Sequence, residues 1–546
     1  MKFLISGFIS FAVLFVYTTS VQCAEQFDVV VIGGTPGGIA AALSAGRAGH
    51  SVLLVEEQLH LGGMMTSGLG KSDVEKRDLI GGVFVEFTKR VKQAYVSRYG
   101  PQHPNIALCQ DGYYYEPSVA ERILNEMLRE VQSVTTMTGW RLNSARREDR
   151  RLAEVEIVND QTQEARDVAA KVFIDATYEG DLFAAAGAQF RVGREAREEF
   201  QEPHAGVVYF DFNNKEFLPG STGTADDRIP AYTYRLCLTT DPDNAVPLLE
   251  PPPDYDRARY LGYFDDLQAG RLAGPKNFKP GRGYNPAHFN TLVRALSVTP
   301  LPNRKTDVNI NPRPLGFLFA EENRGYLEGT PAQRREIRER IRNLTLGLLW
   351  FLQTDTEIPE EHRRLARAYH LPLDEFADNG HFPFQLYVRE GRRLRALYTL
   401  TELDVTGDSA KGTIHHADSI AIGEFPIDSF PCRKRQPGDS VVLEGYLGML
   451  DHITRPYEIP YRIMIPEELD GLIVPVAAGT THVAFSSIRM EPTWMALGQA
   501  AGTAAHLAIA DKVAPRHVDA VKLQKQLVQN GQIIHHQDQA SKKVQP

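Results

Sequence analysis

The sequence predicts an α/β protein, with a three-layer domain of parallel strands and helices that is interrupted by an inserted domain of mixed α+β structure. Three observations support this fold class. Residues 28–57 read as a strand, a glycine-rich turn, a small-residue helix and a second strand. A buried strand at 472–476 and a second small-residue helix around 495–507 lie near the end of the chain. Between these regions, from about residue 190, Pro, Asn and Tyr become frequent and the strand-like runs become short.

The first β-α-β unit has the layout of a Rossmann-like dinucleotide-binding fingerprint. A hydrophobic run stops at a turn made of Gly33, Gly34, Thr35, Pro36, Gly37 and Gly38. Gly33 allows a sharp turn, Gly38 lets the helix pack close to the strand, and the helix N-terminus offers free N–H groups to a pyrophosphate. Glu56 ends the second strand, where it can accept hydrogen bonds from ribose hydroxyls. Thr35 departs from the G-x-G-x-x-G pattern at its middle glycine.

The elements that follow are predicted from periodicity and turn residues. A glycine doublet, Leu61-Gly62-Gly63-Met64-Met65, brings backbone close to a neighbour, and residues 117–131 have helical periodicity. Two strands follow with a turn at 147–150, and 171–181 reads as a buried strand that enters a turn. A long helix is expected over 330–353, and strands from residue 382 onward.

These elements predict a division of the chain into domains. We expect a discontinuous nucleotide-binding domain, residues 25–190 plus 385–515, with residues 191–384 inserted as the substrate or cap domain. The tail, residues 530–546, is expected to be disordered.

Composition limits the classes of function. The chain has 546 residues, 42% hydrophobic and 24% charged, which is typical of a globular protein of two or three domains. Its formal net charge is −9, so there is no basic excess to neutralise phosphates, and nucleic acid is not an expected partner.

The N-terminus resembles a secretory signal peptide. Met1-Lys2 precedes an apolar run from Phe3 to Tyr17, and cleavage is expected after Ala24. The alternative is a membrane anchor, but the run is shorter than the roughly 20 residues that cross a bilayer. We therefore expect an exported protein, periplasmic or extracellular, whose mature chain has no membrane span.

Cysteine and histidine give no metal site. Cys109, Cys237 and Cys432 are far apart in sequence, so one disulfide is possible, but no C-x-x-C spacing exists to hold zinc or an iron–sulfur cluster. Neighbours on a strand face opposite ways, so the pairs 415–416 and 535–536 are rejected as metal ligands. The mixed charges of residues 334–340 predict a solvated helix face.

Five motifs together resemble the FAD-dependent oxidoreductases of the glutathione-reductase-like flavoprotein superfamily, in an exported form. They are VIGGTPGG, LGGMM, FIDATYEGDL, LYVREGRR and SSIRMEPTWMALGQAAG, and the similarity extends from about residue 27 to residue 510. The resemblance implies that FAD is the cofactor.

The resemblance also implies how the chain holds FAD. The turn from Gly33 to Gly38 would hold the pyrophosphate and Glu56 the adenosine ribose. Gly62, Gly63 and Met64 would lie near the ribityl chain and the flavin, and Asp175, Ala176 and Thr177 would run along the cofactor. The last helix would direct its N-terminus, placed at Leu497, Gly498 and Gln499, toward flavin O2, where a positive helix end stabilises the reduced flavin.

The catalytic candidates are His482, Arg389 and Arg489, with His381 in reserve. His482 follows a buried strand and is the candidate base for a substrate hydroxyl, although a hydrogen-bonded turn histidine is the alternative. Arg389 belongs to the LYVREGRR motif and is suited to gripping a carboxylate or a phosphate, although a solvated strand end with ion pairs is the alternative.

These features predict an oxidoreductase that transfers a hydride from a small polar molecule, such as a sugar or polyol, to flavin N5. An unidentified electron acceptor would then reoxidise the flavin. Two alternatives stay open at this point: an NAD-dependent dehydrogenase on the same fold, and a non-catalytic flavin-binding scaffold.

Overall fold

The fold is taken from a computed structural model, which describes residues 24–211, 214–268, 296–310, 319–407, 413–435 and 442–536. The predicted signal peptide, apart from Ala24, lies outside the described residues. None of the helices within the described ranges combines the length and the apolar character that a membrane crossing requires.

The largest sheet of the described residues has seven strands. Its parallel part has the order β3 (Val134–Thr138), β2 (Val52–Glu56), β1 (Glu25–Ile32) and β6 (Ala165–Asp175), and β20 (Leu472–Ile473) pairs parallel to β6. The antiparallel strands β5 (Arg151–Asn159) and β4 (Trp140–Glu148) continue the sheet from β6. The carboxyl ends of β1, β2 and β6 therefore meet at one edge, where α/β sheets bind their ligands.

The sheet buries both of its faces, which explains the unbroken apolar run of β1. Val29 and Val31 belong to one core together with α1 (Pro36–Arg47), and Val30 and Ile32 belong to another with Trp140. Parallel strands that are covered on both sides have this continuous hydrophobic pattern.

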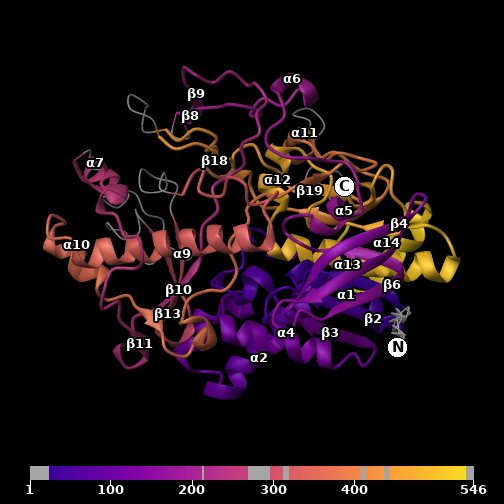
Figure 1. The fold of residues 1–546 in the computed structure, drawn as a ribbon, viewed down its shortest axis with the longest axis horizontal. Helices are drawn as coiled ribbons and strands as arrows, with labels where there is room; N and C mark the ends of the chain where they lie inside the picture. The colour runs from indigo at the N-terminus through magenta and orange to yellow at the C-terminus, as the bar shows by residue number, and fades with distance from the viewer. Residues whose placement is uncertain are drawn as a thin grey trace, which may run out of the picture.

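The two ends of the chain build the same layer of helices. Helix α13 (Glu491–Asp511) lies on α1, and a Cβ atom on Gly498 would be 1.9 Å from the carbonyl oxygen of Gly37. Figure 1 shows α13 and α14 (Ala520–Gln529), in yellow, beside the indigo and purple N-terminal elements. Helices α2 (Gly82–Tyr99) and α4 (Pro117–Arg129) complete this layer.

The middle of the chain adds a second body of structure, on the left of Figure 1. Its sheet has the order β10 (Leu236–Thr239), β13 (Lys305–Ile310) and β12 (Leu296–Pro300), all antiparallel. The long helix α9 (Pro331–Thr354) starts at a capping box, in which Thr330 and Gln333 each accept a hydrogen bond from the other's backbone. This helix extends from the inserted region toward the central sheet (Figure 1).

The remaining elements are short. The helices are α3 (Pro104–Leu108), α5 (Asp181–Ala185), α6 (Arg197–Phe200), α7 (Gly262–Gln268), α10 (Glu360–Ala366), α11 (Glu402–Thr406) and α12 (His482–Ile488). The strands are β7 (Phe190–Arg191), β8 (Phe210–Asp211), β9 (Glu216–Phe217), β11 (Ala245–Val246), β14 (Leu371–Pro372), β15 (Arg393–Leu394), β16 (Ser419–Gly423), β17 (Asp428–Ser429), β18 (Gly448–Met449) and β19 (Tyr457–Pro460).

Three expected elements differ from the structure. Strand β20 has two residues, because the Val474 N–H turns away from the sheet and donates to the carbonyl of Met464. The described part of the region from residue 382 has strands, as predicted, but each of the strands from β15 to β20 has only two to five residues. Within the described residues 530–536, Gln532 and Ile534 are buried and Gln532 Nε2 donates to the carbonyl of Ile420 (2.6 Å), while 537–546 lie outside the description.

Candidate functional site: a nucleotide cleft and an adjoining buried charge cluster

A cleft of about 330 Å³ opens at the carboxyl ends of the parallel strands. Its lining includes Ile32 at the end of β1 and Gly33 after it, Glu56 at the end of β2, and Thr177 after β6. These residues come from three separate strand ends, so the cleft follows from the strand order and not from one loop. The sequence predicted this position through the fingerprint of the first β-α-β unit.

The glycine turn is too tight for side chains at its first and last positions. Gly33 has a φ of +101°, and a Cβ atom there would lie 2.6 Å from the carbonyl carbon of Ala176. A Cβ atom on Gly38 would lie 1.9 Å from the carbonyl oxygen of Gly33. Helix α1 therefore sits directly on the end of β1, as the two glycines predict.

Thr35 has a structural role that its departure from the glycine pattern did not indicate. Its hydroxyl donates to the carbonyl oxygen of Ala176 (2.8 Å) and accepts from the Gly38 N–H (3.2 Å), so it is the N-cap of α1. Pro36 has no N–H, and the N–H of Gly37 has no acceptor in the described part of the chain. Gly37 thus keeps the donor that a helix N-terminus offers to a phosphate.

Glu56 holds the rim of the cleft. Its carboxylate accepts hydrogen bonds from the N–H groups of Gly34 (2.6 Å) and Gln58 (2.8 Å). Burial raises the pKa of Glu56 to about 7, against the lowering effect of those two bonds. The carboxyl group therefore lies in the cleft lining in the place predicted for a ribose contact, and the contact itself stays a prediction.

Arginines of α9 reach the cleft, which corrects one prediction. Residues 334–340 were expected to form a solvated helix face, yet Arg334 and Arg338 line the cleft. Arg334 pairs with Asp181 (2.6 Å) and Arg338 with Glu57 (3.0 Å), whose acids follow β6 and β2. Periodicity placed this helix correctly, but the partners lie more than 150 residues away in sequence.

The residues predicted to run along the cofactor after β6 divide between two roles. Thr177 lines the cleft. The Asp175 carboxylate faces its own loop, where it accepts from the Thr177 hydroxyl (2.7 Å) and the Phe183 N–H (2.9 Å), and burial raises its pKa to about 6. The Ala176 carbonyl receives the Thr35 hydroxyl. Asp175 and Ala176 therefore shape this loop.

The glycine doublet lies against the same loop. Gly62 and Gly63 have φ values of +104° and +51°, and the Met64 N–H donates to the Tyr178 hydroxyl (3.1 Å). Tyr178 also lines the cleft, and its ring lies 5.2 Å from that of Trp494 in the first turn of α13. The doublet, the cleft and the start of α13 therefore meet at Tyr178.

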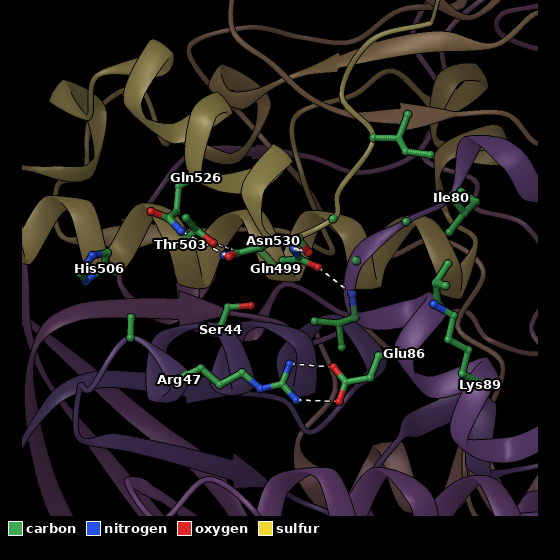
Figure 2. A pocket seen from close by; sticks show the side chains of 17 residues that line it. Ser44, Arg47, Ile80, Glu86, Lys89, Gln499, Thr503, His506, Gln526 and Asn530 are labelled. Carbon is green, nitrogen blue, oxygen red and sulfur yellow. Dashed lines mark hydrogen bonds and ion pairs between the residues drawn. The ribbon is translucent and has the colours of Figure 1, made fainter. Parts of the chain in front are cut away.

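The last helix begins earlier than predicted. Since α13 starts at Glu491, residues Leu497, Gly498 and Gln499 lie in its second and third turns and not at its N-terminus. Gly498 packs on Gly37, and the Gln499 side chain accepts from the Val83 N–H (2.8 Å). Figure 2 shows Gln499 in a separate pocket of about 860 Å³ between α1, α2, α13 and α14. The prediction that these three residues form the N-terminus of the helix is wrong, because Glu491 is its first residue.

Arg389 and Arg489, two of the predicted catalytic residues, meet at Tyr387. Arg489 Nη1 donates to the Tyr387 hydroxyl (2.8 Å), and the Arg389 guanidinium lies over the Tyr387 ring, 4.3 Å from its centroid. Arg489 also lies 3.6 Å from Asp428. All of these side chains except that of Asp428 are buried. The interpretation of Arg389 as a solvated strand end is therefore wrong.

Glu491 is a functional candidate that the sequence analysis missed. Both of its carboxyl oxygens are buried without a hydrogen-bond partner among the described residues. Burial and the nearby charge of Asp73 raise its pKa to about 8, while Arg235 and Arg489 lower it. The available signal was an acid at the start of an otherwise small and apolar helix, inside the motif RMEPTW.

His482 belongs to a second, neighbouring cluster. It opens α12, and its Nδ1 lies 2.7 Å from Glu390 Oε2 while its N–H donates to Glu195 (2.9 Å). Arg393 joins the two acids at 3.0 Å and 3.1 Å. The LYVREGRR motif therefore carries residues of both clusters, Tyr387 and Arg389 of the first and Glu390 and Arg393 of the second. His381, the reserve candidate, lies in a turn in which its N–H donates to Phe376.

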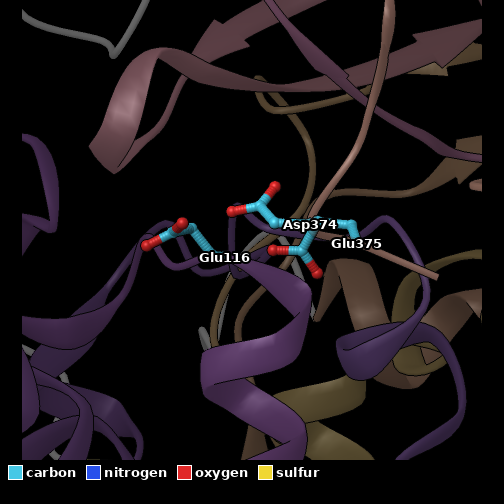
Figure 3. A group of neighbouring side chains, drawn as sticks. All are labelled: Glu116, Asp374 and Glu375. Atoms are coloured by element: carbon cyan, nitrogen blue, oxygen red, sulfur yellow. The ribbon is translucent and has the colours of Figure 1, made fainter. Parts of the chain in front are cut away.

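A group of three acids elsewhere has the spacing of metal ligands but already holds a cation. Glu116, Asp374 and Glu375 bring their oxygens together (Figure 3). The buried Lys305 Nζ lies 2.6–2.9 Å from all three carboxylates. These acids are therefore the counter-ions of an ammonium group.

The other histidine and cysteine candidates have ordinary surroundings. His415 and His535 each contact Glu458. Cys109, Cys237 and Cys432 are all free, so the possible disulfide among them is not formed.

Individual relatives resemble parts of the chain. An NADH oxidase of Thermoanaerobacter brockii is 44% identical over 50 residues, which are 9% of this chain and 8% of that protein. The myxobacterial chondrochloren halogenase CndH aligns with 59% of this chain and 60% of its own, at 16% identity and a TM-score of 0.27. A bacillithiol disulfide reductase from Bacillus cereus aligns with 29% of this chain and 41% of its own, at 18% identity and a TM-score of 0.20. The chain thus spans less than a tenth of the curated relative.

The family comparison covers nearly the whole chain. A family model described as "FAD dependent oxidoreductase" matches residues 28–527. That range contains the glycine turn, the cleft and the start of α13. The two tight glycines, the free Gly37 N–H and the cleft at the strand ends all suit the pyrophosphate-binding half of FAD. The chain therefore belongs to the FAD-dependent oxidoreductase family, and its cofactor is FAD.

Proposed function

We propose that this oxidoreductase oxidises a small polar substrate, such as a sugar or polyol, and passes the electrons to an acceptor that is still to be identified. FAD, when bound, supplies the hydride acceptor at N5. One observation carries the proposal: a buried cluster of ionisable groups adjoins the nucleotide cleft at Tyr178. The Arg392 guanidinium donates to the carbonyl of Glu179, so the motif that carries Arg389 and Glu390 lies directly beside the cleft loop.

In this proposal, His482 is the base that accepts the substrate hydroxyl proton. Glu390 lies 2.7 Å from Nδ1 of His482, a distance that fixes the orientation of the ring and leaves Nε2 for the proton. A positioned base of this kind contributes about 100-fold or more to a rate.

Flavin content and reduction test the enzymatic part of the proposal. The full chain is purified, its visible spectrum is recorded, and sugars, polyols and sugar acids are added one at a time without oxygen. We expect bound flavin whose absorbance is bleached by at least one member of the panel. Bound flavin that no candidate bleaches would argue against the sugar or polyol class. A protein purified without flavin, and unable to take it up, would contradict the proposed function itself.

We also propose that the protein is exported and that the leader, residues 1–24, is removed. The support is the short apolar run after Lys2 and the small residues that end at Ala24. The N-terminal sequence of the protein recovered outside the cytoplasm tests this, with Glu25 as the expected first residue. A chain that retains Met1 in the cytoplasm would contradict it.

A further inference from the structure

One buried cation has no anionic partner. The buried Lys and Arg residues of the described chain are Arg194, Arg235, Lys305, Arg389, Arg392, Arg393 and Arg489. Six of these seven have a carboxylate oxygen within 4.0 Å. Arg389 is the exception in the part of the chain that the structure describes, although only 1% of it is exposed.

The surroundings of Arg389 fix its position without neutralising its charge. Nη1 donates to the carbonyl oxygen of Ala231 (2.8 Å), Nη2 has a long contact to the Asn309 side chain (3.4 Å), and Nε has no hydrogen-bond partner among the described residues. The guanidinium lies 3.6 Å from the centroid of the Phe430 ring and 4.3 Å from that of Tyr387. Two aromatic rings orient a planar cation, but they are a weak substitute for a carboxylate.

Burial is the main cost of this position. Burial, Arg489 and Arg235 lower the pKa of Arg389 to about 9 against the raising effect of Tyr387 and Asp428, whereas the pKa of every other buried arginine with a resolved shift is raised. An ion buried without a partner costs several kcal/mol of folding free energy.

The buried acid Glu491 is not the counter-ion of Arg389. Glu491 is buried in the same region, yet within the described ranges neither of its oxygens has a hydrogen-bond partner, Arg389 included. Asp428 lies 3.6 Å from Arg489 and has no ion pair with Arg389. The region therefore combines an unpaired cation with the Tyr387 hydroxyl and an unpaired carboxyl group, which suits a ligand that carries an acid group and hydroxyl groups.

We propose that Arg389 binds a carboxylate of the substrate, so that the molecule oxidised is a small hydroxy acid or sugar acid and not a neutral sugar. This inference rests on the proposed function and narrows its substrate class. A guanidinium that is already oriented by two rings binds a carboxylate with little loss of side-chain freedom. The substrate then supplies the charge that the protein lacks at this point.

Equilibrium binding to the oxidised holoenzyme tests the proposal without turnover. Acetate and succinate are titrated against their neutral amides, acetamide and succinamide, and the visible spectrum of the flavin and the melting temperature report binding. We expect the carboxylates to bind and the amides not to bind. Arg389→Met should weaken carboxylate binding about 30-fold or more, as the loss of one partner of a buried charge pair does. Arg335→Met, an exposed charge on α9, is the matched control and should bind like the wild type.

A stability measurement separates a binding role from a structural one. Because Arg389 is an unpaired buried charge, Arg389→Met should leave the melting temperature of the ligand-free holoenzyme unchanged or higher, while it abolishes the rise caused by succinate. A strongly lowered melting temperature without ligand would show that Arg389 serves the fold, and would overturn the proposal.

The negative charge that Arg389 faces could also come from the reduced flavin and not from a substrate carboxylate. The reduction potential of the flavin distinguishes these two cases. If Arg389 serves the substrate, Arg389→Met should leave the flavin potential unchanged in the absence of carboxylate. A lower potential with unaltered succinate binding would assign Arg389 to the flavin and overturn the proposal. Bound flavin with equal affinity for acids and amides would reject only this inference, whereas a protein without flavin would reject the proposed function.

Discussion

The glycine at the end of the first turn offers the sharpest test of the nucleotide cleft. In Gly38→Ala the new methyl carbon would lie 1.9 Å from the carbonyl oxygen of Gly33, some 1.5 Å short of the 3.4 Å at which ordinary contact begins. The obstacle is backbone, so α1 itself must move off β1. Helix α1 also has little room to move, because α13 packs closely against it. A Cβ atom on Gly498 would lie 1.9 Å from the carbonyl oxygen of Gly37. Overpacking against side chains costs about 1–3 kcal/mol, and we expect about 3 kcal/mol or more here.

Two measurements check this prediction. The ratio of flavin to protein absorbance should fall to near zero in Gly38→Ala, because the displaced helix carries the Gly37 N–H with it. The melting temperature should fall by roughly 5 °C or more. Gly49→Ala is the matched control: Gly49 follows the other end of α1, and no atom lies within 4 Å of its Cβ position. Its φ of +89° costs about 1 kcal/mol for alanine, and its flavin content should be normal. A Gly38→Ala protein with full flavin and an unchanged melting temperature would refute the close-packing argument.

Three further predictions concern the buried charges. The pKa of Glu491 is raised from 4.5 to about 8, so its contribution to folding is present at low pH and is lost as the pH rises through 8. Glu491→Gln should therefore have a higher melting temperature than the wild type at pH 9. The corresponding gain in free energy of unfolding is at most roughly 5 kcal/mol, and it should shrink toward pH 4.5. A gain that is independent of pH would contradict this. Lys305→Met leaves Glu116 and Glu375 buried without their cation. Urea titration should therefore show a free energy of unfolding that is lower by about 3–5 kcal/mol. A loss under about 1 kcal/mol would show that the cluster is solvated. His482→Asn should lower kcat about 100-fold at unchanged flavin content, and an unaltered kcat would remove His482 as the base.

The sequence was most informative where the cause of the structure is local. The turn from Gly33 to Gly38 must be tight wherever a strand feeds directly into a helix, so its geometry could be predicted from the glycine spacing alone. Helices α4 and α9 could be predicted equally well, because the periodicity that identifies them is a local property of the sequence. The family resemblance also predicted the cofactor, which the comparison with known proteins confirms.

The sequence was least informative about side chains whose partners are distant. Arg334 and Arg338 have the periodicity of a solvated face, and only the approach of α9 to the strand ends places them against Asp181 and Glu57. Thr35 looked like a defect of the glycine pattern, because its acceptor, the Ala176 carbonyl, lies 141 residues away. Glu491 was missed for a related reason: an acid at a helix start is an ordinary surface feature until the packing around it is known.

The close contact between α1 and α13 has a consequence for the life history of the protein. The glycine turn lies within the first forty residues, but the surface that supports it, from Leu472 to Gly502, is made more than four hundred residues later. Contacts between such distant segments form late, because loop closure must precede them. We therefore expect the contact between α1 and α13 to form late in folding, after residues 472–502 have been synthesised.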